Sequence, residues 1–311
     1  MRVTVPIPKN FTGYALAIAG AILFSSKAVV VKMAYDKSVD AETLLALRMG
    51  CSLPIYLIIG AFTLRSAKQL PTLRQVVMGM LVGVLGYWLA SYTDFLGLQN
   101  ISATFERLIL FTYPLFVVLM GWAFFGGRLH MGLIPSFLIS YGGLALVFLE
   151  HPPQTSGNAT LGAIYVLIAA LAFGLYQLLA KTQISQIGSQ MFTAIAMLGA
   201  SLVSFATFFV GHKFSDLNVV TTILPHAAFL AIGATVIPTY LLNAALARIS
   251  AQANGAIGMI SPIATIGMST LILGERLTIT EVIGALLVMT GVAFFVWGER
   301  KLSSAPPEPK E

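Results

Sequence analysis

Apolar residues fill long blocks of the chain, and charged or turn-forming residues gather between these blocks. Each block approaches the about 20 apolar residues that a helix needs to cross the hydrocarbon core of a bilayer. A regular strand-like alternation of apolar and polar positions is missing. The pattern therefore predicts an all-α integral membrane protein with ten transmembrane helices. The predicted helices are Phe11–Val31, Glu42–Leu64, Leu73–Leu98, Ala103–Phe125, Met131–Leu149, Leu161–Lys181, Gln190–Val210, Ile223–Ala245, Gln252–Leu273 and Ile279–Trp297.

The composition leaves no room for a soluble domain. Charged residues make up 10% of the chain, whereas a soluble globular protein has about 25% and needs them to cover its surface. Ten helices of about 20 residues use about 200 of the 311 residues, so short tails and connections remain. We expect residues 1–10 to form an amino-terminal tail, and the proline- and charge-rich residues 298–311 to be disordered.

The positive charges indicate which way the helices run. Of the 18 Lys and Arg residues, eleven fall on the side that holds both chain ends, four fall on the opposite side and three lie within helices. Positive residues accumulate on the cytoplasmic side of membrane proteins, so both termini are predicted to be cytoplasmic. Because these charges are scattered between apolar segments, the net charge of +6 indicates no nucleic-acid partner.

The two halves of the chain share an internal duplication. At a spacing of 148 residues, Pro114 matches Pro262 and Gly126 matches Gly274, and a spacing of 149 residues aligns the earlier helices. The predicted repeats, 11–149 and 161–297, contain five helices each, and an odd number inverts the second repeat in the membrane. Inverted repeats are typical of alternating-access transporters. A channel or a scaffold with duplicated halves is the alternative.

The second half carries the stretch by which the chain resembles a known family. Within Ile249–Leu277 it reads Ile-Ser, then Ser-Pro, then Gly-Glu-Arg-Leu, and Gly284 and Gly291 follow. This pattern resembles the drug/metabolite transporter superfamily and, within it, the EamA-type ten-helix carriers. Gly127 stands in the first half where the second half has Glu275. The resemblance implies a central cavity between two five-helix halves, and solutes such as amino acids and other metabolites, nucleotide-sugars or triose phosphates.

Five ionisable residues fall inside predicted helices, where a charge is costly and marks a candidate functional site. We expect them to form a hydrated vestibule or a charge-paired gate towards the extracytoplasmic side, unless the arginines snorkel to the interface. Consecutive residues point about 100° apart on a helix, so the glutamate and arginine at positions 106 and 107 are not expected to face one another. Asp94 with Lys27, and Glu106 with Arg48, are possible pairs. The five gating or coupling candidates are Lys27, Arg48, Asp94, Glu106 and Arg107.

Polar and aromatic residues form stripes on the predicted third, fourth, eighth and ninth helices. Such stripes would line a cavity with aromatic walls, hydroxyls and amides, which suits a small amphipathic solute; packing between helices is the alternative. Pro114 and Pro262 are predicted to be paired kinks that act as hinges, although static bends fit equally well. The candidate substrate-binding residues are Tyr87, Trp88, Ser91, Tyr113, Thr239, Tyr240, Asn243, Asn254 and Ser261.

The sequence lacks the motifs of hydrolases, nucleotide-binding proteins and metalloenzymes. We therefore expect no enzymatic activity, no cofactor, no metal and no obligatory protein partner. The favoured function is a secondary transporter that exports small metabolites, above all amino acids, across a bacterial cytoplasmic membrane by alternating access. The alternatives are a carrier of nucleotide-sugars or amphipathic drugs, and a passive channel.

Overall fold

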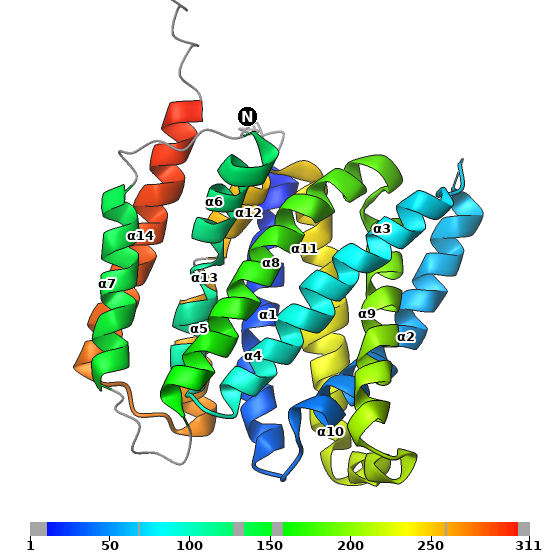
Figure 1. Ribbon diagram of the computed structural model, residues 1–311, viewed down its shortest axis with the longest axis horizontal. Helices are drawn as coiled ribbons and strands as arrows, with labels where there is room; N and C mark the ends of the chain where they lie inside the picture. Colours follow the sequence, from blue (N-terminus) through cyan, green and yellow to red (C-terminus); the bar gives the residue numbers. More distant parts are fainter. Residues whose placement is uncertain (1–10, 68, 127–133, 151–157, 259, 304–311) are drawn as a thin grey trace, which may run out of the picture.

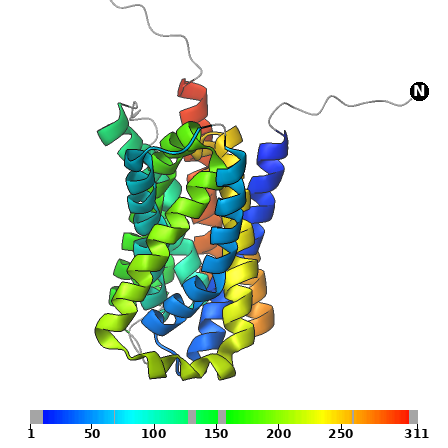
Figure 2. The same ribbon diagram turned by 90° about the vertical axis from the view of Figure 1, so that its right-hand side faces the viewer.

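The protein is a bundle of helices. The structure, a computed structural model, describes residues 11–67, 69–126, 134–150, 158–258 and 260–303, and within these ranges it contains no strand. Most helices run between the same two ends of the bundle, and the chain enters α1 and leaves α14 at one of these ends (Figures 1 and 2). In chain order the elements are α1 (Phe11–Tyr35), α2 (Ala41–Ser66), α3 (Leu73–Gly83), the π-helix η1 (Val84–Leu89), α4 (Ala90–Leu98), α5 (Ala103–Leu110), α6 (Tyr113–Phe125), α7 (Ile134–Glu150), α8 (Ala159–Ile187), α9 (Ser189–Gly211), the 3₁₀ helix η3 (Phe214–Val219), α10 (Val220–Ala231), the π-helix η4 (Ile232–Val236), α11 (Ile237–Arg248), α12 (Ala251–Ile257), α13 (Ile260–Met268), the π-helix η5 (Ser269–Leu273) and α14 (Ile279–Ser303).

Each of the ten predicted stretches is mostly helical where the structure describes it, but Ala103–Phe125 is interrupted at Phe111 and Thr112, and Gln252–Leu273 is interrupted at Gly258. Among the described residues, three apolar helices are shorter: Ile134–Val147, Ile260–Leu273 and Ile279–Gly291. Seven helical stretches are long and apolar enough to cross a membrane, namely Phe11–Tyr35, Ala41–Ser66, Leu73–Leu98, Ala103–Phe125, Ala159–Ile187, Ser189–Gly211 and Thr222–Arg248.

The carboxyl-terminal tail corrects one prediction. Disorder was expected from residue 298, but α14 continues to Ser303. The added turn contains Glu299, Arg300, Lys301 and Leu302, and these residue types favour a helix once it has started. The prediction of disorder is therefore wrong for residues 298–303, while residues 1–10 and 304–311 lie outside the described part of the chain.

Equivalent features recur at the spacing of the sequence duplication. Ser102 and Ser250 each cap a helix, accepting hydrogen bonds from the backbone N–H of Phe105 at 3.1 Å and of Ala253 at 3.0 Å. The π-helices η1 and η4 also begin 148 residues apart, at Val84 and Ile232. The similarity of the two halves therefore extends from sequence to local structure.

Two glycines end the matched helices in the same way. Gly126 follows α6 with φ of 69°, and Gly274 follows η5 with φ of 67°. Glycine adopts this left-handed conformation without the steric cost that a Cβ brings. The helix end is thus encoded identically in both halves.

Small residues let the helices approach closely. An added Cβ at Gly83 of α3 would lie 2.0 Å from the carbonyl oxygen of Ala196 on α9, and one at Gly143 of α7 would lie 2.7 Å from the carbonyl oxygen of Gly284 on α14. Close backbone contact of this kind replaces the hydrophobic driving force that helices lack in lipid. The α7–α14 pair stands at one edge of the bundle, while α1, α5, α8 and α13 surround its interior (Figure 1).

Candidate functional site

A small buried cavity lies where two interrupted helices meet. Its volume is about 40 Å³, with room for a group the size of one or two water molecules. Residues of seven helices from both halves of the chain line it, namely α1, α5, α6, α8, α11, α12 and α13. The lining residues are Ala21, Phe24, Arg107, Leu110, Phe111, Tyr113, Phe173, Gln177, Leu242, Asn254, Gly258 and Ser261.

The interruptions follow from the two matched prolines. Helix α5 ends at Leu110 and α6 begins at Tyr113, with Pro114 in its first turn. Proline lacks the backbone N–H and clashes inside a helix, whereas the first turn of a new helix tolerates it. Helix α12 likewise ends at Ile257, and α13 starts at Ile260, just before Pro262. The predicted kinks are thus breaks in both helices, and residues beside both breaks line the cavity.

The five predicted intramembrane charges are buried together in the described bundle. Lys27 of α1 pairs with Asp94 of α4 at 2.7 Å between Nζ and Oδ2, which is one of the pairings left open by the sequence. Arg48 of α2 instead donates from Nη2 to the carbonyl oxygen of Tyr87 at 3.2 Å. No Glu106–Arg48 ion pair occurs among the described residues.

The contact between Glu106 and Arg107 corrects a second expectation. Arg107 Nε lies 3.7 Å from Glu106 Oε2, although the two residues are consecutive on α5. The Cβ directions do diverge by about 100°, but the long arginine side chain can fold back around the helix. Arg48 and Arg107 are each only 2% exposed, so neither side chain snorkels to the surface of the bundle.

This cluster is incompletely satisfied. At Arg107, both Nε and Nη2 are buried without a hydrogen-bond partner among the described residues, and so are both carboxylate oxygens of Glu106. The ring of Phe24 lies 4.7 Å from Lys27 Nζ and 6.0 Å from the Arg107 guanidinium carbon, which are cation–π distances. Arg107 therefore presents buried donor capacity directly to the cavity that it lines.

A second polar network lies deeper in the bundle and is closed on itself. Tyr87 Oη lies 2.7 Å from Tyr176 Oη, and Tyr176 donates to Asn243 Oδ1 at 2.6 Å. Asn243 Nδ2 donates to Thr193 Oγ1 at 2.9 Å and to Tyr87 Oη at 3.2 Å. In this conformation Tyr87 and Asn243 bond to protein groups and do not line the cavity.

The remaining candidate substrate-binding residues fall into two groups, those that line the cavity and those that lie elsewhere. Tyr113, Asn254 and Ser261 line the cavity. Trp88 instead donates to Thr207 Oγ1 at 3.2 Å, and Tyr240 packs on Tyr56 with ring centroids 5.5 Å apart. Ser91 and Thr239 are buried outside the cavity lining.

Phe24 and Phe173 are cavity residues that the sequence reasoning did not select. Their rings stack with centroids 6.1 Å apart, and Phe173 also contacts Tyr113 at 5.0 Å. The two phenylalanines are matched at a spacing of 149 residues, so the duplication already contained a signal for them. Phe173 stacks on Tyr176 at 5.7 Å and thereby links the cavity to the closed polar network.

Glu275 joins the two halves. It belongs to the segment between η5 and α14, and this segment lies at the end of the bundle opposite the chain ends (Figure 1). Its carboxylate accepts hydrogen bonds from the N–H groups of Ala103 and Thr104 at 3.0 and 3.3 Å, and from the Thr104 hydroxyl at 2.8 Å. A carboxylate at a helix N-terminus also interacts favourably with the helix dipole. Glu275 thus fastens the segment after η5 to the start of α5, and we call this contact the Glu275 latch.

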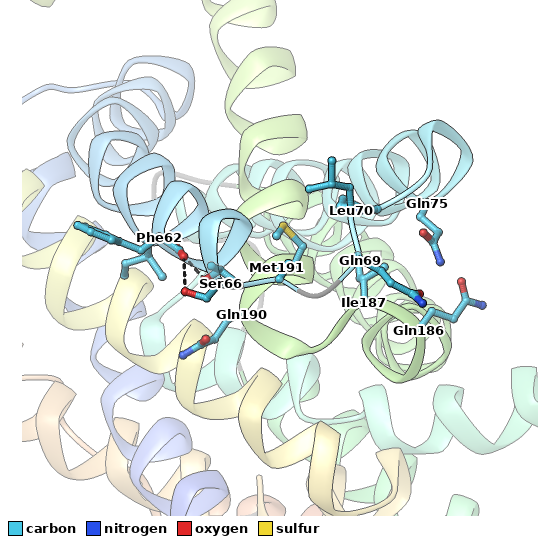
Figure 3. Close-up of a pocket in the computed structure, with 13 residues that line it drawn as sticks. Phe62, Ser66, Gln69, Leu70, Gln75, Gln186, Ile187, Gln190 and Met191 are labelled. Carbon is cyan, nitrogen blue, oxygen red and sulfur yellow. Dashed lines mark hydrogen bonds between the residues drawn. The ribbon is translucent and has the colours of Figure 1, made fainter.

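A larger cavity of about 620 Å³ opens at the other end of the bundle, between the ends of α2, α3, α8 and α9 (Figure 3). The side chains of Gln69, Gln75 and Gln186 gather on one side of it, and Phe62 lies on the other. The described residues that line it carry amides, hydroxyls and apolar groups, and none of these described side chains is ionisable. Because it contains none of the buried charges, we treat the smaller cavity as the candidate site.

These features define an all-helical, multi-pass membrane protein with a polar site enclosed between interrupted helices, a design common among secondary transporters. The chain belongs to the EamA-like transporter family, whose model matches residues 11–149 and again residues 160–297. Both halves of the chain therefore carry the family's domain.

Two named relatives are transporters. The chain is 28% identical over 311 residues to the uncharacterized transporter YcbK of Bacillus subtilis (strain 168), covering 95% of this chain and 96% of that protein. It is 27% identical over 211 residues to a probable amino-acid metabolite efflux pump of Escherichia coli (strain K12), covering 65% of this chain and 70% of that protein. A solved structure, described as a crystal structure of a protein, shares the fold with a TM-score of 0.68 at 16% identity, covering 94% of this chain and 99% of its own.

Proposed function

We propose that this protein is a secondary transporter that exports small metabolites, above all amino acids, by alternating access across a bacterial cytoplasmic membrane. The observation that carries this proposal is the position of the buried cavity at the meeting point of two helix breaks. Transporters place their sites at such discontinuous helices, because the break frees polar groups and permits motion. The name of the Escherichia coli relative supports amino-acid metabolites as the solute class.

The proposal includes ten membrane-spanning helices in two inverted five-helix repeats, 11–149 and 161–297. The recurrence of caps, π-helices and breaks at one spacing supports this arrangement. Both termini lie in the cytoplasm, in agreement with the distribution of Lys and Arg. The larger cavity then faces the cytoplasm, and the Glu275 latch closes the extracytoplasmic end.

The breaks before Pro114 and Pro262 serve as hinges in this mechanism. Motion about them would widen the cavity towards one side of the membrane and then towards the other. The buried charges act as the gate or carry the coupling ion, because the ion pair of Lys27 and Asp94 joins α1 to α4. Moving α1 relative to α4 requires that this ion pair rearrange.

Counterflow in proteoliposomes tests the proposal. Purified protein is reconstituted with unlabelled amino acids inside, and uptake of the labelled amino acids is followed with and without a pH gradient. We expect saturable uptake that preloading accelerates and that Tyr113→Ala reduces, whereas Gln190→Ala in the larger cavity serves as the matched control. Uptake that neither saturates nor responds to preloading would indicate a channel, and counterflow with nucleotide-sugars or amphipathic drugs alone would exclude amino acids.

A further inference from the structure

We propose that the buried cavity recognises zwitterionic α-amino acids with apolar side chains, binding the carboxylate at Arg107 and the ammonium group at Asn254. This inference rests on the proposed transport function and names the two polar contacts that select the substrate. It requires a free carboxylate and a free amino group on the same solute.

Arg107 is the carboxylate contact because two of its guanidinium nitrogens are buried without a hydrogen bond among the described residues, although Glu106 lies at ion-pair distance. The side chain is 2% exposed, and Nε and Nη2 lack hydrogen-bond partners among the described residues. Its nearest carboxylate oxygen, on Glu106, is 3.7 Å away, beyond hydrogen-bond distance. A buried guanidinium in this state favours an incoming carboxylate, which can accept two parallel hydrogen bonds.

The charge balance of the cluster also favours one negative group. The cluster contains three cations, Lys27, Arg48 and Arg107, and two carboxylates, Asp94 and Glu106, so it carries one excess positive charge when all five are ionised. An uncompensated charge in a membrane interior is costly. The carboxylate of a bound zwitterion would offset this charge locally at Arg107, while its ammonium group leaves the total charge unchanged; a nucleotide-sugar would bring two or more negative charges.

Asn254 supplies a hydrogen-bond acceptor on the wall of the cavity that the second half forms. Its Nδ2 donates to Gln177 Oε1 at 3.3 Å, and this bond leaves Asn254 Oδ1 buried without a partner among the described residues. A buried carbonyl oxygen without a donor is unfavourable and suits a substrate ammonium group. The duplication matches Asn254 with Glu106, the neighbour of Arg107, so the two polar contacts come from adjacent positions of the repeat in opposite halves.

The aromatic lining of the cavity favours a substrate with an apolar side chain. Phe24, Phe111, Tyr113 and Phe173 enclose the cavity, and their rings offer apolar surface to a side chain. The volume of about 40 Å³ has room for only one or two water-sized groups in this conformation. The substrate side chain therefore enters when the segments beside the two breaks separate.

A matched ligand series tests the inference on the unmodified protein. Labelled L-phenylalanine counterflow is challenged with L-phenylalanine, with its amide, which lacks the carboxylate, and with 3-phenylpropionate, which lacks the amino group. We expect each analogue to compete at least about tenfold more weakly, because a buried charge-assisted contact is lost. Arg107→Gln should remove the preference for L-phenylalanine over its amide, and Asn254→Ala should remove the preference over 3-phenylpropionate.

Arg48→Gln is the matched control, because it also deletes a buried guanidinium but one outside the cavity lining. It should retain the preference for the carboxylate even if its turnover falls. Equal competition by the amide and L-phenylalanine would overturn the inference and leave amino-acid transport intact. Counterflow of another solute class alone would overturn the inference while preserving a carrier, and no counterflow of any solute would overturn both.

Discussion

The Glu275 latch should favour the closed over the open conformation of its end of the bundle, and a single substitution tests this. Glu275→Gln keeps the shape of the side chain but removes its negative charge and one of its two acceptor oxygens. The carboxylate accepts three hydrogen bonds at the start of α5. Hydrogen bonds to a charged group contribute about 1.5–3 kcal/mol each, against about 0.5–1.5 for neutral groups. Since Glu275 is partly exposed, we expect a net loss of about 2 kcal/mol, at the lower end of these figures.

This loss should open the end of the bundle that holds the latch, which the proposed topology places outside the cytoplasm. The latch forms only while the segment after η5 contacts α5, so a loss of about 2 kcal/mol shifts a two-state equilibrium towards the open form about 30-fold. The end nearer the chain termini should not change in the same way, because Gly127, matched to Glu275, has no carboxylate.

Thiol labelling measures this shift. In a Cys51→Ser background, Ser261→Cys places a thiol in the cavity, and a membrane-impermeant reagent is added from the extracytoplasmic side of intact cells. Glu275→Gln should raise the labelling rate at least tenfold, whereas Asp36→Asn, which removes an exposed carboxylate at the same end, should leave it unchanged. An unaltered labelling rate in a correctly folded Glu275→Gln variant would refute the latch.

Two further substitutions test the packing of the bundle. Lys27→Met should lower the free energy of unfolding by about 3–5 kcal/mol, because it leaves Asp94 buried without its counter-ion. Thermal unfolding in detergent measures this loss, and a second substitution, Asp94→Leu, should restore much of it. Gly83→Ala should cost about 1–3 kcal/mol through a clash with the backbone of α9, whereas Gly121→Ala, with open space around the added Cβ, should be neutral. Equal melting temperatures for the two alanine variants would contradict the close α3–α9 contact.

The helices and the positions of the breaks could be predicted because they depend on local sequence. Apolar length predicts a helix in lipid, and Pro114 and Pro262 act on the turn that contains them. The ends of the helices were less predictable. Helix α14 extends past Trp297, because the charged residues that follow have good helix propensity and continue the helix beyond its apolar stretch.

Contacts between helices could be predicted only in part. The sequence indicated that Lys27, Arg48, Asp94 and Glu106 were unusual, but the pairing of Lys27 with Asp94 depends on the packing of α1 against α4. Helical geometry correctly separated the Cβ directions of consecutive residues, yet it missed the folding back of the Arg107 side chain towards its neighbour. Stripe analysis likewise could not tell whether a polar residue faces a cavity or, like Asn243, bonds to residues of other helices.

The duplication gives the site its symmetry, and substitutions within the duplication remove that symmetry where a substrate would bind. Glu106 corresponds to Asn254 and Tyr113 to Ser261, so the first half presents charge and an aromatic ring where the second half presents an amide and a hydroxyl. Exchange of the two halves' conformations can therefore move the access path, while the chemical polarity across the cavity stays fixed. A bound zwitterion would keep its carboxylate towards α5 and its ammonium group towards α12 throughout the cycle. In the proposed mechanism the breaks supply the motion and the unequal side chains supply the selectivity, so substitutions at the two kinds of position should separate turnover from substrate preference.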